Sequence, residues 1–116
     1  MAGRILVILV ALCLALALPA VAATPPFRGS VGPSAKISLK RASGATIKHA
    51  SRGSHRFRIS DKSGFHNFHL LGPGVNRKTG IAFSGSRTWK VKLSAGTYKF
   101  RCDAHPKTMH GSFKVP

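Results

Sequence analysis

Hydrophobic and polar residues alternate along four short segments between residues 36 and 102. In each segment every second residue is apolar, and the residues between are mainly Lys, Arg or Ser. This is the pattern of a strand with one buried and one solvated face. The segments are "KISLK" at 36–40, "HRFRIS" at 55–60, "WKVKL" at 89–93 and "YKFRC" at 98–102. Helical spacing appears nowhere over a useful length, so the pattern predicts an all-β chain.

Two further segments have strand character. "GSFKV" resumes the alternation at 111–115, and "GFHNFHL" at 64–70 is expected to form a strand of its own. His66 and His69 are three positions apart, so along an extended segment their side chains face opposite sides. Only one of them is therefore expected to point at a given site.

Turn signals separate the expected strands. They are "ASG" at 42–44, "SRG" at 51–53, "DKSG" at 61–64, "GPG" at 72–74 and "SAG" at 94–96. Short strands joined by such turns about every ten residues predict a sandwich or barrel of antiparallel character. The chain shows no internal repeat, and a second domain would not fit.

The N-terminal residues 1–23 have the pattern of an export signal. A short basic start, "MAGR", precedes the apolar run "ILVILVALCLALAL", and Ala20 and Ala22 form a small-residue cleavage site. We expect cleavage near Ala22 or Ala23 and a secreted or periplasmic protein. The alternative is an uncleaved membrane anchor, because residues 5–23 are an apolar stretch of nineteen residues with only Pro19 to disturb it, which is just long enough to span a bilayer. Residues 24–34 are expected to be a flexible lead-in, and residues 35–116 to be the folded domain.

The chain is strongly basic. Its 19 Lys and Arg residues face only 2 acidic residues, which gives a net charge of +17. Of the basic residues only Arg4 lies in the expected signal, so cleavage leaves the charge at +16. Such a charge steers a protein toward anionic partners, whether an acidic protein, a nucleic acid or an anionic cell envelope. The alternative is that the charge serves solubility.

Cys102 is the one cysteine that remains after the expected cleavage, because Cys13 lies in the apolar run. Exported proteins normally carry paired cysteines, and Cys102 has no partner in its own chain. It is therefore buried and inert, paired between molecules, or bound to something. Tyr98, Phe100 and Cys102 share the same side of their strand, so the thiol is expected at its inward-facing end.

The segment "CDAHPKTMHG" places further metal-binding side chains beside that thiol. His105 and Met109 lie on a closed loop between two expected strands, where both can turn toward the Cys102 sulfur. With one histidine from "GFHNFHL", they make a thiolate, two imidazoles and a weak thioether, which is the ligand set of a type 1 copper site. Zinc tolerates the first three donors but seldom recruits methionine.

These motifs resemble those of the cupredoxins. "GTYKFRCDAH" followed by Met109 and Gly111 is similar to the copper loop of plastocyanin, amicyanin and pseudoazurin, and "HNFHL" to the His-Asn segment that precedes it. The resemblance implies a Greek-key β-sandwich that binds one copper ion. It also implies His66, Cys102, His105 and Met109 as the ligands, with Asn67 as a bridging amide that fixes the copper loop.

The chain departs from the family pattern in the copper loop. His105 and Met109 are separated by three residues, between the four of plastocyanin-like loops and the two of amicyanin-like loops. Ala104 stands where the family usually has a proline, and Asp103 puts a carboxylate next to the ligands. Arg101 replaces the aromatic residue of plastocyanin, so no electron route through a surface ring is expected there.

The function that this resemblance implies is one-electron transfer without enzymatic turnover. Pro106 and Phe68 are expected to form an apolar landing patch for an acidic redox protein, such as a cytochrome or an oxidase, and the chain is expected to be a monomer. Two alternatives remain. The chain could carry or scavenge copper without a redox partner, or it could be a basic polyanion-binding envelope module. A nucleic-acid partner is not expected, because Trp89 and Tyr98 are both in core phase.

Overall fold

The structure is a computed structural model that describes residues 3, 8, 10–18 and 24–116. The expected cleavage site near Ala22 and Ala23 lies outside the described residues, so the signal peptide stays a prediction. Among the described residues, no helix is long and apolar enough to span a membrane.

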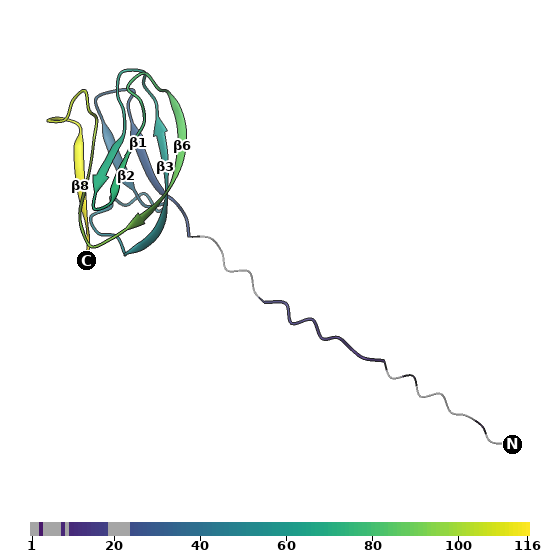
Figure 1. The fold of residues 1–116 in the computed structure, drawn as a ribbon. Coiled ribbons are helices and arrows are strands. Elements are labelled where there is room, and N and C mark those ends of the chain that lie inside the picture. The colour runs from purple at the N-terminus through teal and green to yellow at the C-terminus, as the bar shows by residue number, and fades with distance from the viewer. Residues whose placement is uncertain (1–2, 4–7, 9, 19–23) are drawn as a thin grey trace.

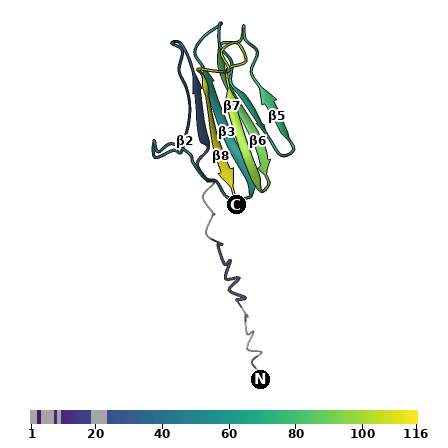
Figure 2. The same cartoon turned by 90° about the vertical axis from the view of Figure 1, so that its left-hand side faces the viewer.

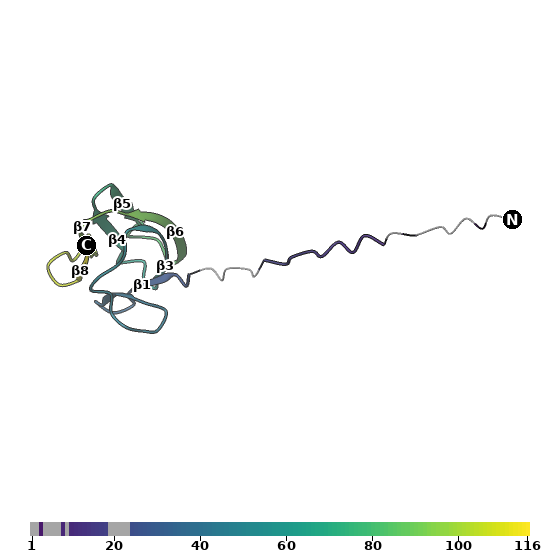
Figure 3. The same ribbon diagram turned by 90° about the horizontal axis from the view of Figure 1, so that it is seen from below.

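Two four-stranded β-sheets pack face to face (Figure 1). The first has the order β2-β1-β3-β6, and the second has the order β5-β4-β7-β8. The strands are β1 (Phe27–Val31), β2 (Ile37–Lys40), β3 (Gly53–Asp61), β4 (His69–Gly72), β5 (Val75–Lys78), β6 (Gly85–Leu93), β7 (Gly96–Arg101) and β8 (His110–Val115). Figure 3 views the sandwich from below, with β1, β3 and β6 of the first sheet and β4, β5, β7 and β8 of the second labelled. The predicted all-β sandwich is confirmed.

The pairing is antiparallel except between β1 and β3, which run parallel. The chain crosses from one sheet to the other between β3 and β4, between β5 and β6, and between β6 and β7. These crossings bring β4, β7 and β8 into one sheet, so segments far apart in the sequence meet at one end of the sandwich.

The expected strands at 36–40, 55–60, 89–93, 98–102 and 111–115 are all present, with bounds that differ by a few residues. Their alternation has the expected cause, because the apolar residues face the core and the basic residues face solvent. In β3 and β6, for example, Phe57 lies opposite Trp89, and both are buried.

The expectation of a flexible lead-in at 24–34 is wrong, since Phe27–Val31 forms β1. Phe27, Gly29 and Val31 face the core from this strand. The alternation of apolar and polar residues is not visible in the sequence, because the second of these three is a glycine. A Cβ there would lie 2.5 Å from Ile59 Cδ1 and 3.0 Å from Phe68 Cε2, so the core leaves no room for a side chain.

The expected strand at 64–70 is also wrong in its first part, because β4 begins only at His69. The backbone N–H groups of Asn67 and Phe68 donate to side chains, the first to Cys102 Sγ at 3.4 Å and the second to Thr79 Oγ1 at 2.9 Å. These side chains take the place of a neighbouring strand, so residues 64–68 form a loop.

Strand β5 has no counterpart in the sequence analysis. Only Val75 of its four residues is apolar, so no alternation marks it. It pairs with β4 through a two-residue turn at Pro73 and Gly74, and Gly74 has a φ of 67°, a conformation that glycine adopts without steric cost.

The core contains a stack of two rings held between two glycines. Phe68 and Phe100 lie parallel with centroids 5.5 Å apart. Gly29 borders Phe68 on one side, and Gly111 borders Phe100 on the other. The stack crosses from one sheet to the other next to the segment that carries His66, and it fixes how closely the sheets approach there.

Candidate metal centre

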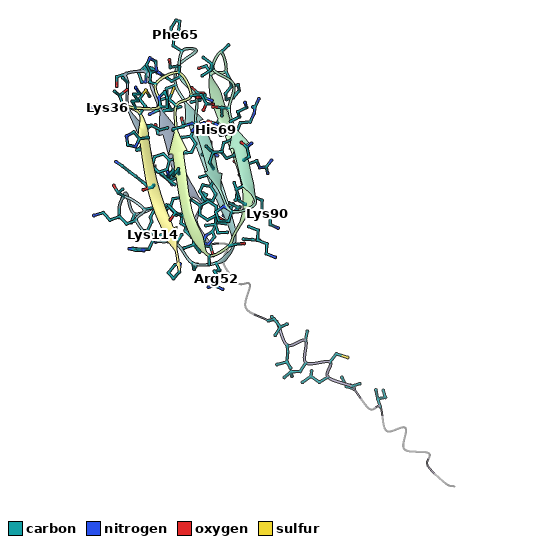
Figure 4. The ribbon with its side chains drawn as sticks, turned by 60° about the vertical axis from the view of Figure 1, so that its left-hand side comes forward. Lys36, Arg52, Phe65, His69, Lys90 and Lys114 are labelled. Atoms are coloured by element: carbon teal, nitrogen blue, oxygen red, sulfur yellow. The ribbon has the colours of Figure 1, made fainter. Side chains whose placement is uncertain are left out.

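The candidate site lies where loops join the strands at one end of the sandwich. Figure 2 shows the loop between β7 and β8 at the end opposite the C-terminus. The loop before β4 reaches the same end, which Figure 4 marks with Phe65, while Arg52 lies at the other. Side chains from residues 63–67 and 102–109 therefore meet there.

Cys102 directly follows β7 and is fully buried, as the strand alternation predicts. Its backbone N–H donates to the carbonyl of Met109 at 2.9 Å, and this bond closes the loop between the two residues. Within the loop, the carbonyl of Cys102 accepts from His105 N–H at 3.1 Å, and the carbonyl of His105 accepts from Met109 N–H at 2.9 Å. These backbone hydrogen bonds help to hold the shape of the loop.

The two predicted histidines face the thiol. Cys102 Sγ lies 3.7 Å from His66 Nδ1 and 3.8 Å from His105 Nδ1. In the part of the chain that the structure describes, these three side chains form the one group of His, Cys, Asp or Glu residues that could hold a metal ion, with donor atoms within 4.8 Å of one another. Met109 is buried in the same core cluster as Cys102.

These separations fit a single ion bound by all three donors. A metal about 2.3 Å from a sulfur and about 2.0 Å from a nitrogen, with an angle of about 120° between the bonds, holds the two atoms about 3.7 Å apart. The sulfur-to-nitrogen distances of 3.7 and 3.8 Å match that value. One thiolate, two imidazoles and a nearby thioether suit copper, whose two charge states prefer these soft and intermediate donors.

Solvent reaches the two imidazoles unequally. His66 is buried, whereas His105 is exposed on the loop. The rings have centroids 4.9 Å apart and meet edge to face. An ion held between them would be shielded from water on the His66 side and would lie close to the surface on the His105 side.

Asn67 joins the two ligand-bearing loops. Its Oδ1 accepts from the backbone N–H of Asp103 at 2.7 Å, and its Nδ2 donates to Asp103 Oδ2 at 2.9 Å and to the carbonyl of Thr79 at 3.0 Å. Its own backbone N–H donates to Cys102 Sγ. This arrangement ties the residue after His66 to the residue after Cys102, and a hydrogen bond to a coordinating sulfur tunes its electron donation.

Asp103, in the loop between β7 and β8, lies at the centre of a polar cluster. Its carboxylate accepts from His69 Nδ1 at 2.8 Å and from Arg101 Nε at 3.0 Å, in addition to Asn67. Burial alone would raise the pKa of Asp103, but the hydrogen bonds from His69, Asn67 and Arg101 outweigh it and lower the pKa to about 2. His69 also contacts Asn76 Oδ1 at 2.6 Å, so this histidine is structural and points away from the thiol.

Asp61 supports the loop before β4 from the opposite sheet. It accepts from the Thr79 hydroxyl at 3.0 Å and from Ser63 N–H at 3.2 Å, and Thr79 in turn accepts from Phe68 N–H. Burial raises the pKa of Asp61, and the bonds from Ser63 and Thr79 and the nearby His66 offset only part of that effect. Sequence reasoning gave Asp61 and Thr79 no role, because their contact joins the end of β3 to the residue after β5, and these lie far apart in the sequence.

The expectation that Phe68 contributes to a landing patch is wrong, because Phe68 is fully buried in the ring stack. Pro106 is exposed, as that expectation requires. Phe65 is 79% exposed at the same end of the molecule (Figure 4) and is the aromatic residue that the sequence analysis missed. The sequence signal for it was that Phe65 directly precedes His66, a candidate ligand. The expectation of a strand at 64–70 hid the exposure of Phe65, because the segment is a loop.

The chain has structural relatives among copper proteins. Reduced rusticyanin superposes with a TM-score of 0.55 at 14% identity, over 78% of this chain and 77% of that one. A second rusticyanin structure, described as that of a copper protein, gives a TM-score of 0.54 at 14% identity and covers 78% and 76%. An oxidised amicyanin variant gives 0.52 at 20% identity and covers 82% and 86%. No protein-family profile and no curated protein sequence matches the chain.

Proposed function

Since the chain has the cupredoxin fold, we propose that it is a type 1 copper protein that carries one electron at a time between other redox proteins. His66, Cys102, His105 and Met109 hold the ion. The observation that carries this proposal is the approach of two imidazole Nδ1 atoms to one buried thiol sulfur, at 3.7 and 3.8 Å.

Bound copper supplies a one-electron couple between Cu(I) and Cu(II). The chain's own part is to keep the donors in place while the charge changes. The backbone bonds of the loop from Cys102 to Met109 and the Asn67 side chain fix the thiol and His105 relative to His66. Burial of Cys102, Met109 and His66 excludes water from one side of the site. Little rearrangement is then needed, and electron transfer is fast.

Exposed His105 is the expected point of contact with redox partners. Pro106 lies next to it in the loop, and exposed Phe65 lies at the same end of the sandwich. Together these side chains offer an apolar surface beside the electron route. The surrounding positive charge steers acidic redox proteins toward the molecule and favours encounter. The chain turns over no substrate in this role.

The place of action that fits this role is outside the cytoplasm. The N-terminal segment 1–23 supports that assignment through its basic start, apolar run and small-residue cleavage site. A thiol bound to copper is also protected from the oxidation that a lone exported cysteine would face.

The direct test is to add Cu(II) to the purified protein and to a Cys102→Ser variant, and to record visible absorption and EPR spectra. We expect an intense thiolate-to-copper band with narrow copper hyperfine splitting in the wild-type protein, and loss of both in the variant. A pale tetragonal copper spectrum in the wild-type protein would refute the proposal. Circular dichroism of both proteins shows whether the variant remains folded.

A further inference from the structure

The outer face of the β2-β1-β3-β6 sheet is covered by basic side chains. The inward residues of these strands fill the core, so the residues between them point to solvent. Six of the outward residues are Lys or Arg, and all six are exposed. This basic face consists of Arg28, Lys40, Arg56, Arg58, Lys90 and Lys92.

The strand register sets these charges side by side. Arg28 is paired with Lys40 on one side and with Arg58 on the other, and Arg56 is paired with Lys90 on the next strand. Like charges directly opposite each other across strands destabilise a sheet. A bound anion would therefore relieve repulsion between these neighbouring cations.

A row of hydroxyl groups runs beside the charges. Ser30 is paired with Ser38 and with Ser60, and Ser60 is paired with Ser86, so one serine from each of the four strands lines up across the sheet. Serine is a poor strand former compared with threonine or valine. Its hydroxyl donates hydrogen bonds, as do guanidinium and ammonium groups, and phosphate oxygens accept them all.

The charge and hydroxyl rows border a groove with a volume of about 520 Å³. Its lining includes Arg28, Ser30, Arg58, Ser60 and Lys62. No carboxylate neutralises it, because the chain has only two acidic residues. Asp61 points into the core, and Asp103 lies in the loop after β7 and is already paired.

We propose that the basic face binds the phosphate headgroups of an anionic lipid bilayer. The cations lie on all four strands, which are about 4.8 Å apart, so they form a two-dimensional array and not a single line. Such an array matches the surface of a bilayer, where each nearby Lys or Arg adds attraction to anionic lipids.

Other anionic partners fit this face less well. Specific protein interfaces contain buried aromatic or apolar anchors, and the outward residues of this face in β1, β2, β3 and β6 are only Lys, Arg, Ser and Thr. Single-stranded nucleic acid is held by aromatic residues on which bases stack, and the face has none. Thr24 and Pro25 line a neighbouring groove with Arg56 and Lys90, so the described chain approaches β1 beside this face.

Binding through this face leaves the candidate metal centre free. The face lies on the broad outer side of one sheet, whereas His105 is exposed on the loop at the end of the sandwich. The protein could therefore rest on a membrane and still present His105 to a partner. The membrane proposal does not depend on copper, since none of the six basic residues contacts the metal-binding side chains.

Two variants with equal net charge test the proposal. The face variant carries Arg28→Gln, Arg58→Gln, Lys90→Gln and Lys92→Gln. The control variant carries Lys48→Gln, Lys78→Gln, Lys99→Gln and Lys114→Gln, which lie on or beside the other sheet and are exposed. Figure 4 labels Lys90 and Lys114, one from each set. Arg56 is kept because its guanidinium donates to the carbonyl of Thr24 at 2.7 Å.

Each protein is expressed from the full sequence and purified in the form that the cell produces. It is then sedimented with vesicles of phosphatidylcholine, either pure or with about 30% phosphatidylglycerol. We expect the wild-type protein to prefer the anionic vesicles at least about 100-fold, and the face variant to lose at least about 10-fold more binding than the control variant. The pure phosphatidylcholine vesicles measure any contribution from a retained apolar segment. Circular dichroism establishes that both variants fold.

Equal losses in the two variants would overturn the proposal, because net charge alone would then explain binding. Equal binding to both kinds of vesicle would also overturn it. Tighter binding to duplex DNA or polyphosphate than to anionic vesicles at the same salt would assign the face to a polymer instead. The Cys102→Ser protein should bind vesicles as well as the wild type, so failure of the copper proposal leaves this test intact.

Discussion

At the scale of single residues, the candidate metal centre depends on two polar side chains that bind no metal. Asn67 and Asp103 contact each other through both backbone and side chain, and Asp103 also accepts from His69 and Arg101. These bonds fix the residue that follows His66 and the residue that follows Cys102. The positions of the His66 and Cys102 side chains are therefore set largely by Asn67 and Asp103, the residues that follow them.

The two acidic residues should affect acid stability with opposite signs. The folded-state pKa of Asp103, about 2, lies below the ordinary 3.8, so its stabilisation is present above pH 3.8 and is lost as the pH falls toward 2. Asp103→Asn should lower the free energy of unfolding at pH 6 by about 1 kcal/mol, allowing for solvent screening of this partly exposed group, and the difference should vanish near pH 2. Urea unfolding of the metal-free protein from pH 2 to 7 measures it.

Asp61→Asn is the contrasting variant. The pKa of Asp61 is raised in the folded protein, so its contribution is fully present below pH 3.8 and is lost as the pH rises through the raised value. As the pH falls, Asp61 takes up its proton first, and the free energy of unfolding of the wild-type protein should rise. Asp103 takes up its proton at lower pH, and the free energy of unfolding should then fall. A pH profile identical for Asp103→Asn and wild type would contradict the assignment of Asp103.

At the scale of strands and loops, the sequence predicts those elements whose apolar residues alternate without interruption. The segments around Phe57, Trp89 and Tyr98 are of this kind, and so is the position of Cys102 at an inward-facing strand end. Strand β1 is concealed by Gly29, whose side chain is absent because Phe68 and Ile59 fill the space. Contacts of this type depend on the other sheet, so local pattern cannot reveal them.

The loop before β4 shows the same limit in the candidate site. The motif around His66 and Asn67 indicates which residues belong to the site, but not that the segment is a loop. That outcome depends on Cys102 and Thr79, which accept its N–H groups from elsewhere in the fold. The burial of Phe68 and the exposure of Phe65 follow from the path of this loop. The alternation of apolar and polar residues along the sequence could not predict either of them.

The ring stack between the sheets should tolerate no added methyl group. In Gly111→Ala the new Cβ would lie 2.3 Å from Phe100 Cζ and would push this ring against Phe68. We expect the free energy of unfolding to fall by about 1–3 kcal/mol, as in other overpacked cores. Denaturant unfolding of the metal-free protein gives the value.

Gly80→Ala is the matched control, because its Cβ would meet only Phe83 Cβ at 3.8 Å, an ordinary contact. Its stability should stay within about 0.5 kcal/mol of wild type. If both alanine variants are equally stable, the close approach at Gly111 does not constrain the core.

At the scale of the whole molecule, charge is the dominant property. The net charge of +17 is spread over strands in both sheets instead of one terminal tail. Long-range attraction of anions and repulsion of cations should therefore act on every encounter of the copper-loaded protein with a small redox reagent.

Electron exchange should respond to salt in opposite directions for reagents of opposite charge. Stopped-flow oxidation of the reduced protein by anionic hexacyanoferrate(III) should slow about 10-fold between low and high salt, and oxidation by a cationic cobalt(III) complex should accelerate. Slow exchange with both reagents, independent of salt, would contradict electron transfer and favour a copper carrier or scavenger.

The engagement of both carboxylates has a consequence for how copies of the protein behave together. With a pI near 11.7, the molecule stays cationic at every pH below strong alkali, so isoelectric precipitation should not occur. Because Asp61 is buried and Asp103 is already paired, one copy has no free aspartate to offer to the lysines of another. Concentrated solutions should therefore remain dispersed until a multivalent counterion bridges the molecules.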